Sequence, residues 1–298
     1  MSDSTAGTAN LDLEQSLFGE EQPTNYFVAS APRAPVAWYG GKAYYAEWII
    51  SKFPRHRVYI EPFGGAANVL LRKRPSDVEV FNDLDDRIVN FFRVVRDPRS
   101  LAELERRAYL TPYSRSEFVA LVDAPEPAES VDRAWWFFVR CRQAIGGLGM
   151  SKLYAASWAM STRTRRHMPE PVSKYLSAIE GLTEVAERFR TVAIECLPAI
   201  QLIEKYDAAD VFFYCDPPYV PETRHGGAAS TYGKEMSFED HEALLTTLVQ
   251  CKGRVMVSGY PSDLYERMLA GWTRESCTAT AHLTNSGEER EEVIWMKL

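Results

Sequence analysis

The residue types needed to hold an exocyclic amine occur together in the segment Asp216-Pro217-Pro218-Tyr219. The Asp216 carboxylate and the Pro217 carbonyl can accept the two hydrogens of such an amine, and the Tyr219 ring can stack on the base that carries it. Both prolines lack a backbone donor and fix the turn, so the carbonyl can point into a site. The segment follows the apolar run 211–214. Because ligands bind beyond the carboxyl ends of strands in doubly wound sheets, it predicts a site for an amine-bearing ring.

A second pattern, typical of a nucleoside-containing cofactor, lies upstream. The segment 61–68 contains Gly64 and Gly65 between an expected strand and an expected helix. Small residues there let the backbone approach a cofactor closely. Asp83 ends the next expected strand, about 20 residues later, where a carboxylate can accept hydrogen bonds from ribose hydroxyls. The spacing strengthens the prediction of a cofactor site.

A third candidate segment is Trp38-Tyr39-Gly40-Gly41-Lys42, which precedes an aromatic-rich helical stretch. It is not a phosphate-binding P-loop, because Val36 and Ala43 stand where that motif requires Gly and Ser or Thr. Lys42 can instead pair with a carboxylate, and Trp38 can pack on an apolar or cationic ligand group.

The elements that must position these residues alternate between β-rich and helical runs. Expected strands cover 58–60, 78–81, 191–196, 211–214 and 254–258. Such alternation is typical of an α/β fold with a doubly wound, mostly parallel sheet. Ser237 and Asp240 form a capping-box pattern at the start of an amphipathic helix. The last strands, 273–282 and 291–297, predict an antiparallel hairpin with its turn at 285–287.

The stretch 101–190 breaks this alternation, since its pattern is mainly helical and prolines punctuate it. We therefore expect a helical insert at 101–190 within a cofactor-binding domain made of 31–100 and 191–298. Residues 1–30 are acidic and rich in small polar side chains, which predicts a flexible tail.

Basic residues concentrate in the insert. Because the whole chain carries a net charge of −7 and the segment 133–174 carries +7, the remainder carries −14. A locally basic face on an acidic protein is what binding to a phosphate backbone requires. The candidate phosphate contacts are Arg140, Arg142, Arg163, Arg165 and Arg166. A solvated charged face over core aromatic residues is the alternative interpretation.

Taken together, these motifs resemble the DNA adenine methyltransferase (Dam-like) family. The matching segments, in chain order, are 38–42, 61–71, 82–85, 216–219 and the stretch that contains Tyr232, Phe238 and His241. Members of this family place the Gly-Gly-Lys segment first, the methyl-donor turn second, a helical target-recognition insert third and the catalytic tetrapeptide last. Ala67 departs from the family pattern, which usually has Gly at that position.

The resemblance implies a Rossmann-like methyltransferase fold, with S-adenosylmethionine as cofactor and double-stranded DNA as partner. The residues that would contact the cofactor are Trp38, Lys42, Phe63, Gly65, Asp83 and Asp216. Trp38 and Lys42 would hold its amino-acid end, and Asp83 would bind its ribose hydroxyls. The catalytic residues would be Asp216, Pro217 and Tyr219.

The expected reaction is direct in-line transfer of the methyl group to the 6-amino group of adenine. Because a base inside a duplex cannot be reached, the adenine would be flipped out and stacked on Tyr219, beneath a flap at 220–235. The 4-amino group of cytosine, an RNA base and a glutamine side chain remain alternative acceptors. A nucleic-acid-binding relative without catalysis is a further alternative, against which stands the joint retention of Lys42, Asp83, Asp216 and Tyr219.

Composition and cysteine usage exclude several other classes of protein. With 298 residues, 46% hydrophobic and 25% charged, the chain is typical of a globular protein and has no apolar run near the roughly 20 residues of a membrane span. Its five cysteines and five histidines show neither disulfide nor metal-ligand spacing, so no metal site is expected. These features predict a monomer in the cytoplasm of a bacterial or phage-infected cell. The tail segment 14–18 loosely resembles peptides that dock on bacterial sliding clamps, which makes a clamp a candidate partner.

Overall fold

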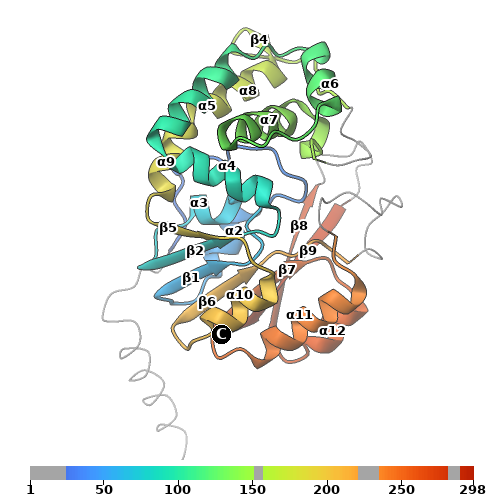
Figure 1. The fold of residues 1–298 in the computed structure, drawn as a ribbon. Coiled ribbons are helices and arrows are strands. Elements are labelled where there is room, and N and C mark those ends of the chain that lie inside the picture. Colours follow the sequence, from blue (N-terminus) through green and yellow to red (C-terminus); the bar gives the residue numbers. More distant parts are fainter. Residues whose placement is uncertain (1–24, 151–156, 221–234, 281–288) are drawn as a thin grey trace, which may run out of the picture.

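The computed structural model describes residues 25–150, 157–220, 235–280 and 289–298, and a seven-stranded sheet in the order β5-β2-β1-β6-β7-β9-β8 forms its centre (Figure 1). The strands are β1 (Val58–Glu61), β2 (Val78–Asn82), β5 (Val192–Glu195), β6 (Val211–Cys215), β7 (Arg254–Gly259), β8 (Thr273–Thr280) and β9 (Glu289–Lys297). Neighbouring strands from β5 to β7 are parallel, whereas β9 pairs antiparallel with both β7 and β8. The predicted fold class, a mostly parallel sheet with an antiparallel C-terminal strand pair, is confirmed.

Helices cover both faces of the sheet (Figure 1). The helices of one face are α2 (Ala46–Ser51), α3 (Asn68–Arg72) and α4 (Asp86–Arg96), and those of the other are α10 (Ala199–Tyr206), α11 (Phe238–Gln250) and α12 (Asp263–Met268). Strand β6 contributes to both cores, since Phe212 and Tyr214 pack on the α2 side and Phe213 and Cys215 on the α11 side. Burial on both faces explains why the sequence of β6 is continuously apolar and does not alternate with polar residues.

The sequence-based element predictions agree with this arrangement to within one or two residues for each described strand of the parallel part. The capping box at the start of α11 is present, because Ser237 accepts a hydrogen bond from the Asp240 backbone and Asp240 accepts one from the Ser237 backbone. Helices α4, α10 and α12 were not predicted. The expected turn at 285–287 and most of the expected flap at 220–235 lie outside the described residues.

A helical region packs beyond α4, on the side of the sheet that carries α2 and α3 (Figure 1). It consists of α5 (Pro98–Leu110), α6 (Arg115–Asp123), α7 (Ser130–Gln143), α8 (Glu170–Glu180), α9 (Leu182–Phe189) and a small hairpin of β3 (Thr164–Arg165) and β4 (Met168–Pro169). Phe189 of α9 stacks on Phe92 of α4, with ring centroids 4.2 Å apart. The insert therefore shares its core with the helical layer of the sheet.

The N-terminal boundary differs from the expected one. Tyr26 is 5% exposed, stacks on His56, and its carbonyl accepts a hydrogen bond from the Arg74 backbone. Residues 26–28 therefore pack against the domain, so the expected flexible tail does not continue unbroken to residue 30. The clamp-like segment 14–18 lies outside the described residues.

No helix within the described ranges is long and apolar enough to cross a membrane.

Candidate active site

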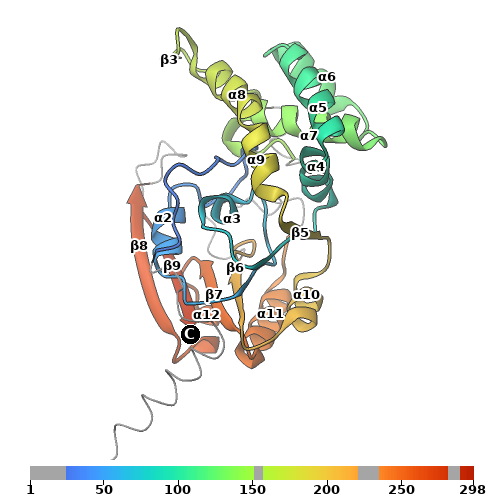
Figure 2. The same ribbon diagram turned by 90° about the vertical axis from the view of Figure 1, so that its left-hand side faces the viewer.

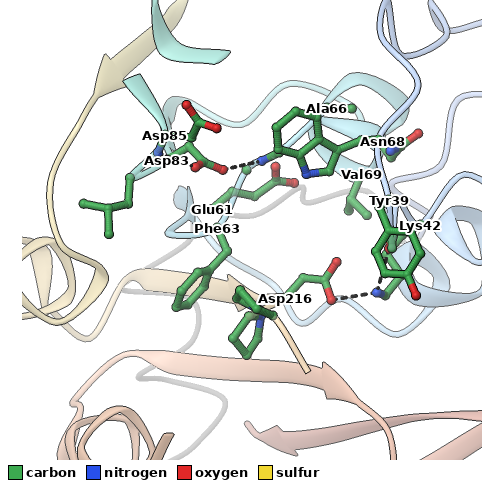
Figure 3. Close-up of a pocket in the computed structure, with 18 of the residues that line it drawn as sticks. Tyr39, Lys42, Glu61, Phe63, Ala66, Asn68, Val69, Asp83, Asp85 and Asp216 are labelled. Carbon is green, nitrogen blue, oxygen red and sulfur yellow. Dashed lines mark hydrogen bonds and ion pairs between the residues drawn. The ribbon is translucent and has the colours of Figure 1, made fainter. Parts of the chain in front are cut away.

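A cavity of about 140 Å³ opens at the carboxyl ends of β1, β2 and β6 (Figure 3). Its lining includes all six residues that the sequence suggests for cofactor contact, namely Trp38, Lys42, Phe63, Gly65, Asp83 and Asp216. Asp83 and the pair of Asp216 and Lys42 lie on opposite sides of it (Figure 3). Three segments that are far apart in the sequence thus meet at one edge of the sheet, as expected for a parallel α/β fold.

The turn between β1 and α3 forms one wall and requires glycine. Gly65 has φ +46°, and a Cβ at this position would lie 2.9 Å from Trp38 Nε1. A side chain at Gly64 would clash with the ring of Phe81. Ala67 also adopts a left-handed conformation, with φ 57°, which costs an alanine roughly 1 kcal/mol. This strain explains why glycine is the usual residue in the family pattern, and complete burial of the Ala67 methyl group offsets it.

Asp83 ties the second strand to this turn. Its Oδ2 accepts a hydrogen bond from the Gly65 backbone and its Oδ1 one from the Asp85 backbone, each 2.8 Å long. Burial raises the pKa of Asp83 to about 6, although these backbone hydrogen bonds oppose the shift. The carboxylate is therefore mostly ionised at neutral pH and keeps free lone pairs for a further donor.

Glu61, at the end of β1, lines the cavity and was missed by the sequence analysis as a separate candidate. It is 2% exposed and accepts a hydrogen bond of 2.5 Å from the Tyr59 hydroxyl. Burial raises the pKa of Glu61 to about 8. The sequence does carry a signal for Glu61, because it is an acidic residue at the end of an apolar strand. Carboxyl groups at such buried positions are usually paired or functional.

Lys42 lies at the centre of a buried ionic cluster. It is 3% exposed, and its Nζ lies 2.7 Å from Asp216 Oδ1 and 3.5 Å from Glu292 Oε1. The same ammonium donates to the Tyr219 hydroxyl at 2.5 Å and to the Gly40 carbonyl at 3.2 Å. Burial lowers the pKa of Lys42, but the carboxylates of Asp216 and Glu292 outweigh it and the net shift is upward.

The donors of Lys42 therefore point into the protein. An ammonium group has three hydrogens, and Asp216, Tyr219 and Gly40 take them. This arrangement agrees with the pairing to a carboxylate that the residue types suggested. The contact to the amino-acid end of the cofactor that the resemblance implied stays a prediction, since Lys42 also lines the cavity.

Asp216 is held through one of its two oxygens. Oδ1 accepts hydrogen bonds from Lys42 and from the Ser258 hydroxyl at 2.9 Å, and Ser258 in turn lies 3.1 Å from the Tyr214 hydroxyl. Within the described ranges, no hydrogen bond to Oδ2 is found. The carboxylate is therefore fixed in orientation while one oxygen stays open to a further donor.

Tyr219 is buried beside this carboxylate instead of lining the cavity. Its hydroxyl lies 2.8 and 2.9 Å from the two oxygens of Glu292, and its ring packs on Tyr260 with centroids 4.3 Å apart. Glu292 on β9 was not predicted. No local pattern singles it out, because both faces of β9 are apolar and buried from Val293 to Met296.

The candidate phosphate contacts divide into two groups. Arg163, Arg165 and Arg166 are exposed on the β3–β4 hairpin, which projects from the end of α8 (Figure 2). Arg166 is also paired with Glu180 at 2.9 Å. Arg140 and Arg142 belong to the other group, which faces the protein interior.

Arg140 and Arg142 have more enclosed surroundings than the hairpin arginines. Arg140 is 9% exposed, lies over the Trp136 ring and donates to the Gly149 carbonyl. Arg142 donates to the Ala34 carbonyl, its Nε is buried without a partner, and burial lowers its pKa to about 10. Arg140 is therefore largely enclosed, whereas Arg142 is only partly buried, and the phosphate contacts expected of both stay predictions.

Replacing Lys42 with Met should destabilise the protein by about 3 kcal/mol, because the buried Glu292 would then face the partly buried Asp216 without a cation. The loss should be larger above about pH 7, where Glu292 is ionised, and smaller below it, where protonation of Glu292 removes its repulsion. Urea denaturation at several pH values measures this. The control is Lys52→Met, since Lys52 pairs with Glu275 near the surface and should cost less than about 1 kcal/mol. Equal losses in both variants would contradict a buried cluster.

Comparison with known proteins identifies the family. The family model described as D12 class N6 adenine-specific DNA methyltransferase matches residues 38–296. Similar proteins include a DNA adenine methylase of Vibrio cholerae serotype O1, which is 22% identical over 271 residues that cover 88% of this chain and 93% of the relative.

Two further relatives have comparable similarity. A DNA adenine methylase of Serratia marcescens is 24% identical over 247 residues, covering 78% of this chain and 85% of the relative. The type II methyltransferase M.MjaIII of Methanocaldococcus jannaschii is 22% identical over 286 residues, covering 87% and 95%. The family match includes the cavity, the Asp216 segment and the C-terminal strand pair, and it confirms the resemblance inferred from the sequence. The chain belongs to the D12 class of N6 adenine-specific DNA methyltransferases.

Proposed function

We propose that this adenine-specific enzyme transfers a methyl group from S-adenosylmethionine to the 6-amino group of an adenine flipped out of double-stranded DNA. The observation that carries the proposal is the hydrogen bonding of the Asp216 carboxylate at the edge of the cavity. Lys42 and Ser258 hold one of its oxygens, and the other is left to accept a hydrogen of the amine. Adenine specificity comes from family membership.

The residues around the cavity fit an elongated nucleoside cofactor. The absence of a side chain at Gly65 lets the Trp38 indole lie close against the turn, and Phe63 adds an apolar surface. On the far side, the Asp83 carboxylate is placed to accept hydrogen bonds from ribose hydroxyls. S-Adenosylmethionine would supply a methyl group activated by a positively charged sulfur.

Asp216 and Pro217 would prepare the amine for attack. An adenine amine is a poor nucleophile, because its lone pair is delocalised into the ring. Two acceptors, Asp216 Oδ2 and the Pro217 carbonyl, would favour a pyramidal nitrogen and stabilise the positive charge that develops on it. Since Lys42 and Ser258 already fix the carboxylate, little reorganisation would be needed during transfer.

Tyr219 would stack on the flipped adenine once entry of the base uncovers its ring, which is buried against Tyr260 in the structure. Its hydroxyl is anchored to Glu292, which fixes the plane of the ring immediately after the two prolines. Flipping a base costs a few kcal/mol, and stacking on an aromatic ring offsets about 1–3 kcal/mol of it.

The insert 101–190 would recognise the DNA target, with the β3–β4 hairpin at its surface. Arg163, Arg165 and Arg166 are the exposed members of the basic segment and would neutralise phosphates.

Replacing Asp216 with Asn should slow methyl transfer to DNA by at least about 100-fold, because the amide cannot stabilise the positive charge on the amine. DNA affinity should stay within about threefold of the parent, since the residue contacts no phosphate in the proposal. Methylation with labelled cofactor and fluorescence anisotropy measure the two quantities. Asp263→Asn, at an exposed carboxylate on α12, should keep full activity. A rate above about a tenth of the parental rate would refute the role of Asp216.

Replacing Gly65 with Ala should weaken S-adenosylmethionine binding by at least about tenfold, because the new methyl group would meet Trp38 Nε1 and displace the indole. Isothermal titration calorimetry measures the affinity. Gly271→Ala is the matched control, since Gly271 also has a positive φ, +90°, but nothing lies within 4 Å of its Cβ position. Similar affinities in both variants would mean that Gly65 does not border the cofactor site.

The double change Arg163→Gln and Arg165→Gln should weaken DNA binding and flatten its salt dependence. Each lost phosphate contact should lower the slope of log affinity against log salt by about 1. The control is Arg267→Gln, since Arg267 is 68% exposed on α12, outside the insert. A slope equal to that of the parent would place the DNA backbone elsewhere on the protein.

The remaining expectations stay predictions. They concern a monomeric state, a cytoplasmic setting and a contact between segment 14–18 and a sliding clamp.

A further inference from the structure

We propose that Glu292 of β9 is a positioning residue for methyl transfer, which keeps the Lys42 ammonium shared between two carboxylates and so preserves a net negative charge at Asp216. This inference rests on the proposed function of Asp216. It assigns a role in the reaction to the last strand of the sheet, far in sequence from both the cofactor turn and the tetrapeptide.

The geometry places Glu292 directly behind the reacting carboxylate. Its Oε1 lies 3.5 Å from Lys42 Nζ, which lies 2.7 Å from Asp216. Both of its oxygens also accept from the Tyr219 hydroxyl, at 2.8 and 2.9 Å. Glu292 is 2% exposed and does not line the cavity. It therefore acts on the reaction only through Lys42 and Tyr219.

The charge balance of the cluster explains why a second carboxylate is needed. Lys42 and Asp216 alone would form a neutral ion pair, in which the ammonium cancels the charge that must stabilise a cationic amine. Glu292 adds one negative charge, so that the buried cluster as a whole carries a single negative charge. In a site of low dielectric constant, this charge acts strongly on a positive charge that develops nearby.

Glu292 occupies an otherwise apolar face of β9, which it shares with the buried residues Ile294 and Met296. Burying a charged group is costly unless it is paired. The partners of Glu292 are the Lys42 ammonium and the Tyr219 hydroxyl, and the same ammonium contacts Asp216. The charge of Glu292 is therefore coupled to the reacting carboxylate.

The charge on Glu292 depends on pH. Burial raises its pKa to about 7, while Lys42 opposes the shift. Among the residues that the structure describes, the titratable groups around it are Lys42, Tyr45, Tyr214, Asp216, Tyr219, Tyr260 and Cys277. Since the carboxylate is the active form, the rate of methyl transfer should fall as the pH drops through about 7.

Single-turnover methylation of duplex DNA, measured between roughly pH 6 and 8.5, tests this inference. The isosteric change Glu292→Gln should lower the rate at about pH 8 by at least about tenfold and abolish the inflection near neutrality. Its affinity for S-adenosylmethionine should stay within about twofold of the parent. The control is Glu291→Gln, because Glu291 is exposed on the same strand and should keep the parental rate and inflection.

Two results would overturn the inference. One is a Glu292→Gln variant with the parental rate, and the other is a slower variant with an unchanged inflection, as expected of a merely structural role. If Glu292→Gln does not fold, Glu292→Asp carries the test, because it keeps the charge and must keep the inflection. A parental enzyme that left adenine unmethylated would instead refute the proposed function, so the two failures are distinguishable.

Discussion

The ion pair between Lys42 and Asp216 is the interaction on which the site depends. It joins the loop before α2 to the turn after β6, and Glu292 extends it to β9. A buried ammonium must find acceptors for all three of its hydrogens, and a buried carboxylate must find donors or protonate. These two demands fix Asp216 in a single orientation, with Ser258 as its second donor. The open oxygen of Asp216 is a consequence of this satisfied network.

The sheet order makes the network possible. Because β6, β7 and β9 are neighbours, Asp216, Ser258 and Glu292 reach the same place from three adjacent strands. Because β9 runs antiparallel to β7, Glu292 near the start of β9 lies at the edge of the sheet where the parallel strands end. The same edge receives the glycine turn after β1 and Asp83 after β2, so the cofactor cavity and the ionic cluster share one border.

Local sequence patterns were sufficient to predict most of the sheet and the short segments that line the cavity. Period-2 and period-3.6 patterns with turn residues specify strands such as β1 and β6, and Ser237 with Asp240 specifies the start of α11. Helix α4 was missed, although its sequence carries a start signal, since the Asp85 side chain caps it. The helices α10 and α12 have eight and six residues, which gives a periodic pattern little length in which to appear.

Burial and partners of charged residues could not be predicted, since they depend on contacts between distant segments. Arg140 and Arg142 belong to a basic segment, yet α7 turns both into the interior. Lys42 matched a cofactor-binding position in the family pattern, but only the fold brings Asp216 and Glu292 to it. Charge counts along the chain therefore indicate a DNA-binding region without identifying which guanidinium groups face the DNA.

The most direct test of this account is a crystal structure of the enzyme with S-adenosylhomocysteine and a DNA duplex that contains its target adenine. We predict that the 6-amino group donates to Asp216 Oδ2, while Oδ1 keeps Lys42 and Ser258 as its donors. A complex in which Lys42 has left Asp216 to bind the amino-acid end of the cofactor, or in which the amine contacts neither Asp216 oxygen, would contradict it.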